Sequence, residues 1–451
     1  MELLWTDQCF LAVLIISAAV ISFSLRKKHV RRAFQSIFKK PLAVSASIVL
    51  LFFLAIAVID SIHLNFPISA NQDPVTGQQN SILDRVMAPL GSFYEKTYSA
   101  PLALNLYSAE TILIDGEARQ VHPRLKYLPK TIKNTHDRTA QLIAVSYRAV
   151  LVSLLIVITL WGLIIGIDWS LGKRLKLIPE KSGISGLITL FICLFVMLAS
   201  YWLSRDFHLL GTGKIGQDIF YYTVKSIRTG LVIGILTTLF MMPLALLLGM
   251  AAGYFGGIID DIIQYLYTTL SSIPGVLLIT ASVLSMQTYI ANHPQQFPTL
   301  SKSADARLLA LCLILGVTSW TSLCRLLRAE TLKLREIDYV MAARALGSSS
   351  FTIIRRHLLP NVMHIVLITL VLDFSFLVLA EAVLSYVGVG VSPMTISWGN
   401  MINGARLELA REPIVWWPMM AAFVFMFILV LASNLFADAV RDAFDPHQAT
   451  L

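Results

Sequence analysis

Charged residues are scarce in this chain of 451 residues: Asp, Glu, Lys and Arg make up 14% of it, whereas 56% is hydrophobic. Soluble globular chains carry about a quarter charged residues, so the composition excludes an ordinary soluble domain and is typical of an integral membrane protein. The net charge of +9 does not indicate nucleic-acid binding. The basic residues occur in short runs beside apolar segments and not along one polar face.

Cysteine is also rare, and its spacing excludes a disulfide framework. The four cysteines, Cys9, Cys193, Cys312 and Cys324, fall in or at the edge of apolar segments without C-x-x-C spacing. We expect them to be small buried hydrophobic residues.

The sequence lacks the patterns of a catalytic site. Neither H-E-x-x-H nor G-x-S-x-G occurs, so a metalloprotease and a serine hydrolase have no visible ligands or nucleophile. The string closest to a P-loop, residues 211–215 (GTGKI), lacks the upstream glycine and the Ser/Thr after the lysine. We therefore expect no enzyme activity, metal or cofactor in this chain. Energy for transport must come from a partner or from an ion gradient.

Long apolar runs are abundant instead. A bilayer core needs about 20 mostly apolar residues in a helix. The hydropathy pattern predicts nine spans, near residues 9–25, 42–60, 143–167, 186–203, 229–250, 264–290, 308–327, 362–388 and 415–436.

Basic residues in short loops orient these spans. Residues 26–40 carry seven Lys/Arg and no acid, and residues 325–357 carry seven Lys/Arg against three acids, so both belong in the cytoplasm. The loop 168–185 is basic as well. The segment 60–140 is balanced, with eight basic and eight acidic residues, and belongs outside together with 390–414. The first span has acidic residues before it and basic residues after it, unlike a signal peptide. We expect the N-terminus outside and the C-terminus inside.

The organisation follows from these spans. We divide the chain into N-terminal spans (1–60), a periplasmic loop (61–140) without clear helical or strand period, an additional span pair (141–204) and a main membrane domain (205–446). Neither an internal repeat nor a broken helix is evident.

Two acidic residues lie inside one predicted span. Asp373 and Glu381 are eight residues apart, which places them about 80° apart around a helix. Intramembrane carboxyl groups are costly and often functional, so both are candidates for a translocation path. A purely structural hydrogen bond to a neighbouring helix is the alternative.

The segment 338–361, DYVMAARALGSSSFTIIRRHLLPN, joins two spans on the cytoplasmic side. Tyr339–Leu346 is expected to be helical, Gly347 to end that helix and allow a turn, and Phe351–Leu358 to form a second helix. We expect Phe351, Ile354 and Leu358 on one apolar stripe of it. Pro360 is expected to end the second helix before the next span begins.

This segment resembles the cytoplasmic "EAA" loop of binding-protein-dependent ABC importer permeases, at Ala342, Ala343, Gly347, Leu359 and Pro360. In that family the loop is the coupling helix that docks into the ATPase subunit. The resemblance therefore implies that Tyr339 and its neighbours face an ATPase. The glutamate of the family, which would add a polar contact to the ATPase, is replaced by Met341 here.

Further motifs are similar to the dipeptide and oligopeptide branch of the same family. They are Gly211, Thr212, Gly216 and Asp218 of GTGKIGQD; the turn 253–257; Glu381 with Leu384, Ser385 and Gly388; Trp398, Gly399 and Asn400 of SWGNM; and the ending 434–446. Together they cover about residues 205–446.

The resemblance implies an all-α polytopic bundle with the core of an ABC type I importer permease in a bacterial inner membrane. It implies a second permease subunit, ATPase subunits that hold ATP and Mg, and a periplasmic solute-binding protein as partners. Peptides are the expected cargo; nickel, glutathione and antimicrobial peptides are carried by relatives. An ion-coupled secondary transporter that uses Asp373 and Glu381 as proton sites is the alternative from another class.

Overall fold

The computed structural model describes residues 4–24, 26, 28–63, 81–114, 117–170, 180–297 and 299–444. Among these residues, nine helices are long and apolar enough to cross a membrane, as the hydropathy pattern predicts. They are α1 (Trp5–Ser24), α3 (Pro41–Ser61), α6 (Thr135–Ser170), α7 (Glu180–Leu203), α8 (Ile219–Phe255), α10 (Gly275–Asn292), α11 (Leu300–Arg335), α14 (Leu359–Val387) and α16 (Trp417–Phe444). The all-α, polytopic fold class is confirmed.

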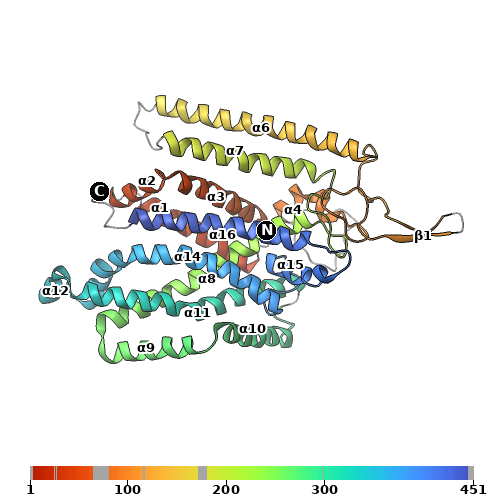
Figure 1. Ribbon diagram of the computed structural model, residues 1–451. Helices are drawn as coiled ribbons and strands as arrows, with labels where there is room; N and C mark the ends of the chain where they lie inside the picture. The colour runs from red at the N-terminus through yellow and green to blue at the C-terminus, as the bar shows by residue number, and fades with distance from the viewer. Residues whose placement is uncertain are drawn as a thin grey trace.

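The two long helices α8 and α11 form the centre of the bundle (Figure 1). Glycines on α8 allow their close approach. A Cβ atom at Gly249 would lie 2.8 Å from the carbonyl oxygen of Cys324, and one at Gly253 would lie 2.7 Å from that of Arg328. Small residues at such contacts are expected, because close van der Waals packing drives helix association inside a membrane.

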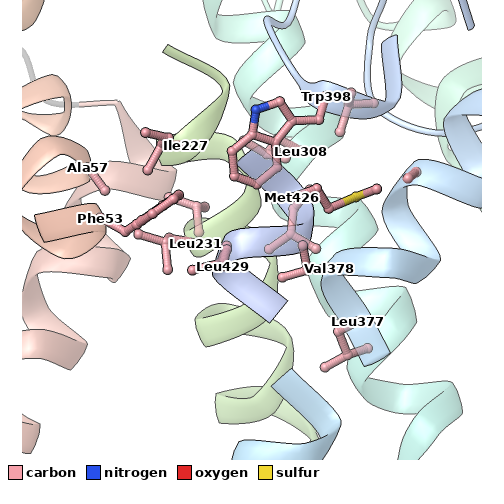
Figure 2. Packing of buried hydrophobic residues seen from close by; sticks show 14 of the residues in the cluster. Phe53, Ala57, Ile227, Leu231, Leu308, Leu377, Val378, Trp398, Met426 and Leu429 are labelled. Carbon is pink, nitrogen blue, oxygen red and sulfur yellow. The ribbon is translucent and has the colours of Figure 1, made fainter. Parts of the chain in front are cut away.

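A buried apolar cluster joins α8 to α3, α14 and α16 (Figure 2). It includes Phe53, Ala57, Ile227, Leu231, Leu308, Leu377, Val378, Trp398, Met426 and Leu429. The pair α6 and α7 lies at the edge of the bundle, where α7 packs on α3 and α6 packs on α7 (Figure 1). These two added helices therefore lie on one side of the central bundle.

One predicted span is not a single continuous helix. The apolar run 264–290 is divided between α9 (Gly257–Ser272) and α10, with Ile273 and Pro274 between them. Proline lacks an amide donor and disfavours helical backbone at the residue before it. The chain thus contains a broken helix, which its hydropathy does not reveal.

The end of the segment 338–361 also differs from its prediction. The helix α13 (Ser350–Ile353) continues through a π-helical turn (Ile354–Leu358) into α14, so Pro360 does not end it. Pro360 occupies the first turn of α14, where a missing amide costs least. The second helix and the following span are one continuous helical segment.

The extramembrane segment has more regular structure than its sequence indicates. Its described part holds α4 (Ile82–Val86), α5 (Ala88–Ser92) and an antiparallel hairpin of β1 (Glu110–Ile114) and β2 (Glu117–Val121), with Ile112 opposite Arg119. Ser81 caps α4 by a reciprocal capping box with Asp84. The segment is a small folded cap, and the hairpin projects from it (Figure 1).

The cap and the segment 338–361 lie at opposite ends of the bundle (Figure 1). The latter begins with α12 (Asp338–Ala345). Two more short helices complete the fold: α2 (Lys28–Ile37), which packs on α16, and α15 (Trp398–Ala405), followed by a 3-10 turn (Glu408–Ala410). The basic residues Lys173, Arg174 and Lys176 and the motif residues Asp445 and Pro446 lie outside the described residues.

Candidate functional site

The turn after α12 depends on Gly347. Its φ of +80° is left-handed, the conformation in which glycine has no Cβ penalty. The amide of Gly347 bonds the carbonyl of Arg344 at 3.0 Å, and the amide of Ser348 bonds that of Ala343 at 3.1 Å. This pair of bonds is a Schellman motif. Ser349 then accepts a bond from the amide of Thr352 at 3.3 Å and caps α13, so the predicted helix–Gly–helix arrangement is present.

Buried residues fix this segment to the bundle. Val340, Ile353 and Leu358 are buried in the cluster at the C-terminal halves of α8 and α11. Ile353 and Leu358 are five residues apart, a spacing that shares one face in a π-helical turn. The predicted stripe of Phe351, Ile354 and Leu358 is therefore wrong at Phe351, whose residue surface is 71% exposed.

The opposite face of the segment is exposed. Met341, Leu346 and Phe351 are exposed, Leu346 to 86%, and Ala342 and Gly347 are exposed between them. Tyr339 is half-exposed, and its hydroxyl accepts a bond of 2.8 Å from Asn361 Nδ2. Leu359 is half-buried, and Pro360 is exposed in the first turn of α14. We call Met341, Ala342, Leu346, Gly347 and Phe351 the coupling patch, after the role that the family resemblance implies for this loop.

The GTGKIGQD turn joins the cap to the start of α8. Gly211 and Gly216 have φ of +72° and +76°, and a Cβ atom at either would overlap the cap backbone, at Ser99 or Glu95. Asp218 caps α8 by accepting the amide of Tyr221 at 3.0 Å. These residues act by shaping a turn and fixing a helix start.

Thr212 connects three segments within the same turn. Its hydroxyl accepts the amide of Ser99 at 2.6 Å and donates to the carbonyl of Thr97 at 2.8 Å. Its carbonyl accepts the indole N–H of Trp417 at 3.0 Å. The turn therefore fixes the cap to both α8 and α16.

A buried charged triad lies beside this turn. His208 Nδ1 lies 2.6 Å from Asp218 Oδ2, and its Nε2 lies 3.7 Å from Glu95 Oε1. Burial opposes the imidazolium, but the two carboxylates outweigh it and raise the pKa of His208 to about 9. Burial would raise the pKa of Glu95, yet the nearby His208 imidazolium and hydrogen bonds from the amides of Lys126 and Tyr127 lower it. The triad is an ion-paired joint between cap and bundle.

Glu381 lies inside the bundle and is bonded. It is 2% exposed, and its Oε1 accepts the hydroxyls of Ser385 at 2.7 Å and Ser397 at 3.0 Å. A Cβ atom at Gly399 would lie 2.6 Å from the same oxygen. Ser397 is the N-cap of α15 and also accepts the amide of Asn400 at 3.1 Å. Glu381 thus holds α15 against α14, the arrangement expected of a structural role.

The other SWGN residues complete this contact. Trp398 is buried and donates its indole N–H to the carbonyl of Thr223 on α8 at 3.0 Å. Asn400 Nδ2 donates to the carbonyls of Ser392 at 2.9 Å and Thr395 at 2.8 Å. The motif therefore packs α15 against α8, α14 and α16.

Asp373 is not part of this cluster. Its side chain is partly exposed on α14, and no hydrogen bond to it is present among the described residues. The two predicted path residues therefore have different surroundings.

Sequence reasoning missed a buried charge cluster at the cap end of α1. Arg228 of α8 donates from Nε and Nη2 to Asp7 Oδ1, at 2.8 and 2.5 Å. His63 Nδ1 lies 3.3 Å from Asp7 Oδ2. The amide of Thr6 bonds Asp305 of α11 at 3.2 Å. The available signal was a charged residue at the end of each of three predicted spans. No sequence spacing indicates that these residues meet.

A second ion pair joins α8 to the cap at the same end. Lys225 Nζ lies 2.5 Å from Asp84 Oδ1, and the hydroxyl of Tyr221 donates to that same oxygen at 2.6 Å. Ser81 Oγ donates to Asp60 of α3 at 2.6 Å. These charges join α1, α3, α4, α8 and α11, so the added N-terminal helix is fixed to the central bundle.

The comparisons with known proteins agree with this architecture. The family described as "Binding-protein-dependent transport system inner membrane component" matches residues 245–450. The chain is 32% identical over 240 residues to the glutathione transport system permease protein GsiD of Pectobacterium atrosepticum, a match that covers 53% of this chain and 72% of that protein.

Two peptide permeases show similar relationships. The oligopeptide transport system permease protein OppC of Mycobacterium tuberculosis is 32% identical over 244 residues, 54% of this chain and 77% of the relative. The dipeptide transport system permease protein DppC of Bacillus subtilis is 28% identical over 239 residues, which cover 53% of this chain and 68% of that protein. A solved structure of the MetNI methionine ABC transporter matches 49% of this chain and 93% of its own at 20% identity, with a TM-score of 0.35.

The fold, the family match and the similar permease sequences define a multi-pass permease of the inner membrane. The chain belongs to the family of binding-protein-dependent transport system inner membrane components, the permeases of ABC importers. It is a transport subunit.

Proposed function

We propose that this chain is one of two permease subunits in an ATP-driven importer for peptides. Separate ATPase subunits, which bind ATP and Mg, would supply the energy, and a periplasmic solute-binding protein would deliver the cargo. The similarity to dipeptide and oligopeptide permeases over 239 to 244 residues supports the cargo class. A peptide suits such a path because its backbone polar groups require matching inside a membrane.

The exposed coupling patch is the observation that supports a coupling role for this segment. Exposed apolar side chains on a rigid turn are unusual at a solvent-facing end, where they mark protein contacts. Val340 and Ile353 anchor the turn to the bundle from its other face, so a force on the patch is transmitted to α11 and α14. We propose that the ATPase receives the patch in a surface groove, with Met341 in place of the glutamate of the family.

We also propose an orientation. The first residues of α1 lie with Asp305 and Arg228 at the cap end, and α16 ends beside α2, where Lys40 pairs with Asp442. The basic segments 26–40 and 325–357 would face the cytoplasm, which puts the cap and the N-terminus in the periplasm. Labelling of a cysteine placed in 26–40 from the outside would contradict this.

Glutathione is the second candidate cargo, because a glutathione permease is among the relatives. Glutathione is itself a short peptide, so both candidates require similar backbone contacts. Competition between unlabelled glutathione, a dipeptide and a pentapeptide for one uptake signal ranks them directly.

Co-purification tests the assembly. We expect the tagged chain to retain an ATPase subunit and a second permease from detergent extracts. Replacing both Leu346 and Phe351 with Ser should release the ATPase while leaving the permease pair, because the coupling patch loses its apolar contact. Replacing the exposed Leu155 and Ile158 of α6 with Ser is the matched control. Equal ATPase retention in both variants would overturn the docking role.

A further inference from the structure

Two arginines without a partner lie beside the coupling patch. Arg355 and Arg356 belong to the π-helical turn (Ile354–Leu358) that joins α13 to α14, and both are exposed. Within the described part of the chain, neither guanidinium has an ion pair, a hydrogen bond or an aromatic ring as its partner. Arg344 of α12, by contrast, lies 5.6 Å from the ring centre of Tyr254. The described fold therefore uses neither of these two positive charges.

The two arginines share the exposed face of Phe351. Phe351 and Arg355 are four residues apart, a spacing that places two side chains on one face of a helix. Ile353 and Leu358 are buried on the opposite face, against the bundle. The rise along the helix from Phe351 to Arg355 is about 6 Å, and Arg356 follows directly. The apolar ring and the two guanidinium groups therefore form one continuous exposed surface.

A protein that covers Phe351 also covers these two charges. A stable protein interface buries about 800 Å² on each partner, an area much wider than the rise of about 6 Å between the ring and the first guanidinium. A guanidinium that loses its water without gaining an acceptor is unfavourable. Carboxylates compensate that loss, because they accept two hydrogen bonds from the guanidinium fork. A groove lined only by apolar side chains would therefore bind this surface poorly.

Phospholipid headgroups are the other class of partner for adjacent arginines. Phe351 precedes both arginines in a continuous helical segment, so it lies further from the apolar span of α14 than they do. Headgroups that reached Arg355 would leave the ring of Phe351 in water, whereas a protein covers the ring and the charges together. The arrangement therefore favours a protein partner.

Because of these observations we propose that the ATPase groove carries carboxylate side chains that pair with Arg355 and Arg356. The inference rests on the proposed importer function and specifies the chemistry of the ATPase surface. The segment 338–361 has Asp338 as its one acidic residue against three arginines, and Met341 stands where the family has a glutamate. The coupling patch therefore presents apolar groups flanked by cations. The two ion pairs fix the orientation of the segment in the groove.

Binding of the ATPase subunit to the detergent-solubilised permease pair tests these ion pairs. Replacing both Arg355 and Arg356 with Gln removes the charges and keeps polar side chains. We expect this double variant to bind the ATPase roughly tenfold or more weakly at low salt, and its binding to depend less on salt than that of the wild type. Lys333→Gln is the matched control, since the Lys333 side chain is 73% exposed on α11. Equal binding by the double variant and the wild type would overturn the proposal and leave the arginines to the membrane surface.

Zero-length cross-linking tests the carboxylates directly. A water-soluble carbodiimide joins a lysine amine to a carboxylate with loss of water and does not couple a guanidinium. We expect Arg356→Lys to form a cross-link to the ATPase that the wild type does not form. A variant that binds the ATPase without this new cross-link would contradict the proposal.

The apolar variant of the coupling patch separates this inference from the proposed docking role. If replacing Leu346 and Phe351 with Ser releases the ATPase but the Gln double variant binds it normally, the docking role stands and the carboxylate pairing is wrong. If neither variant weakens binding, both are wrong. Weaker binding in both variants is the result that the proposal predicts.

Discussion

Glu381 illustrates how a carboxylate inside a membrane domain can be structural. Two serine hydroxyls, from Ser385 on α14 and Ser397 at the start of α15, donate to one of its oxygens. A glutamine oxygen accepts the same two bonds. We therefore expect Glu381→Gln to assemble and transport like the wild type, and Glu381→Ala to lose about 1–3 kcal/mol of stability through unpaired hydroxyls. Uptake and ATPase activity are measured in one reconstituted preparation. A selective loss of uptake in Glu381→Gln, with ATPase activity retained, would instead place the charge in the path.

The turn after α12, which carries the coupling patch, depends on Gly347. A β-branched side chain at its left-handed φ costs about 1–2 kcal/mol, so Gly347→Val should shift the turn and uncouple ATP hydrolysis from uptake. The measurement is the number of peptides imported per ATP hydrolysed. Gly388→Val is the matched control, since Gly388 has φ of +88° and open space around it but lies at the other end of α14. If both variants couple equally well, the turn does not transmit force.

At the scale of an element, the joint between cap and bundle is sensitive to pH. The folded state raises the pKa of His208 from 6.5 to about 9. The imidazolium therefore contributes stability that is fully present below pH 6.5 and is lost as pH rises through about 9. We expect the cap to loosen over that window, as limited proteolysis of residues 81–134 would show. His208→Gln should abolish the pH dependence, and an unchanged pH profile in that variant would contradict it.

The added helix α1 is held by a buried ion pair. Removing one partner from such a pair is costly, about 3–5 kcal/mol, because the other charge remains buried. Asp7→Asn should therefore destabilise the detergent-solubilised protein and expose α1 to proteolysis. The double replacement Asp7→Leu with Arg228→Met removes both charges and should recover much of that loss. If the double variant loses as much stability as the two single replacements lose together, the two residues act independently.

The sequence predicts the elements whose signals are local. Hydropathy locates the apolar segments, and Gly347 with its flanking apolar residues predicts the helix–turn–helix. The break at Pro274 was missed because the apolar run continues across it. The exposure of Phe351 was missed because a π-helical turn changes the register. Asp7 and Arg228 are 221 residues apart, and such a pair leaves no pattern in one sequence. The division of the chain into 1–60, 61–140, 141–204 and 205–446 stays a prediction.

At the scale of the whole molecule, two groups of additional helices lie at the edge of a central bundle that is typical of the family. In the pair, α7 packs on α3 and α6 packs on α7, whereas α1 is fixed by buried charge at the cap end. The coupling patch and the cap lie at opposite ends of the same long helices. A permease that links an ATPase on one side to a binding protein on the other requires this separation. The broken helix would be a feature of a proton-coupled carrier as well, so the energy source distinguishes the two accounts.

Uptake of a labelled peptide into vesicles that contain the full complex tests the central claim most directly. ATP is placed on the side of the coupling patch and the binding protein on the side of the cap, and proton gradients are abolished with an ionophore. The importer account predicts uptake that requires both ATP and the binding protein and is unaffected by the ionophore. Uptake that proceeds without ATP and stops when the ionophore is added would contradict it.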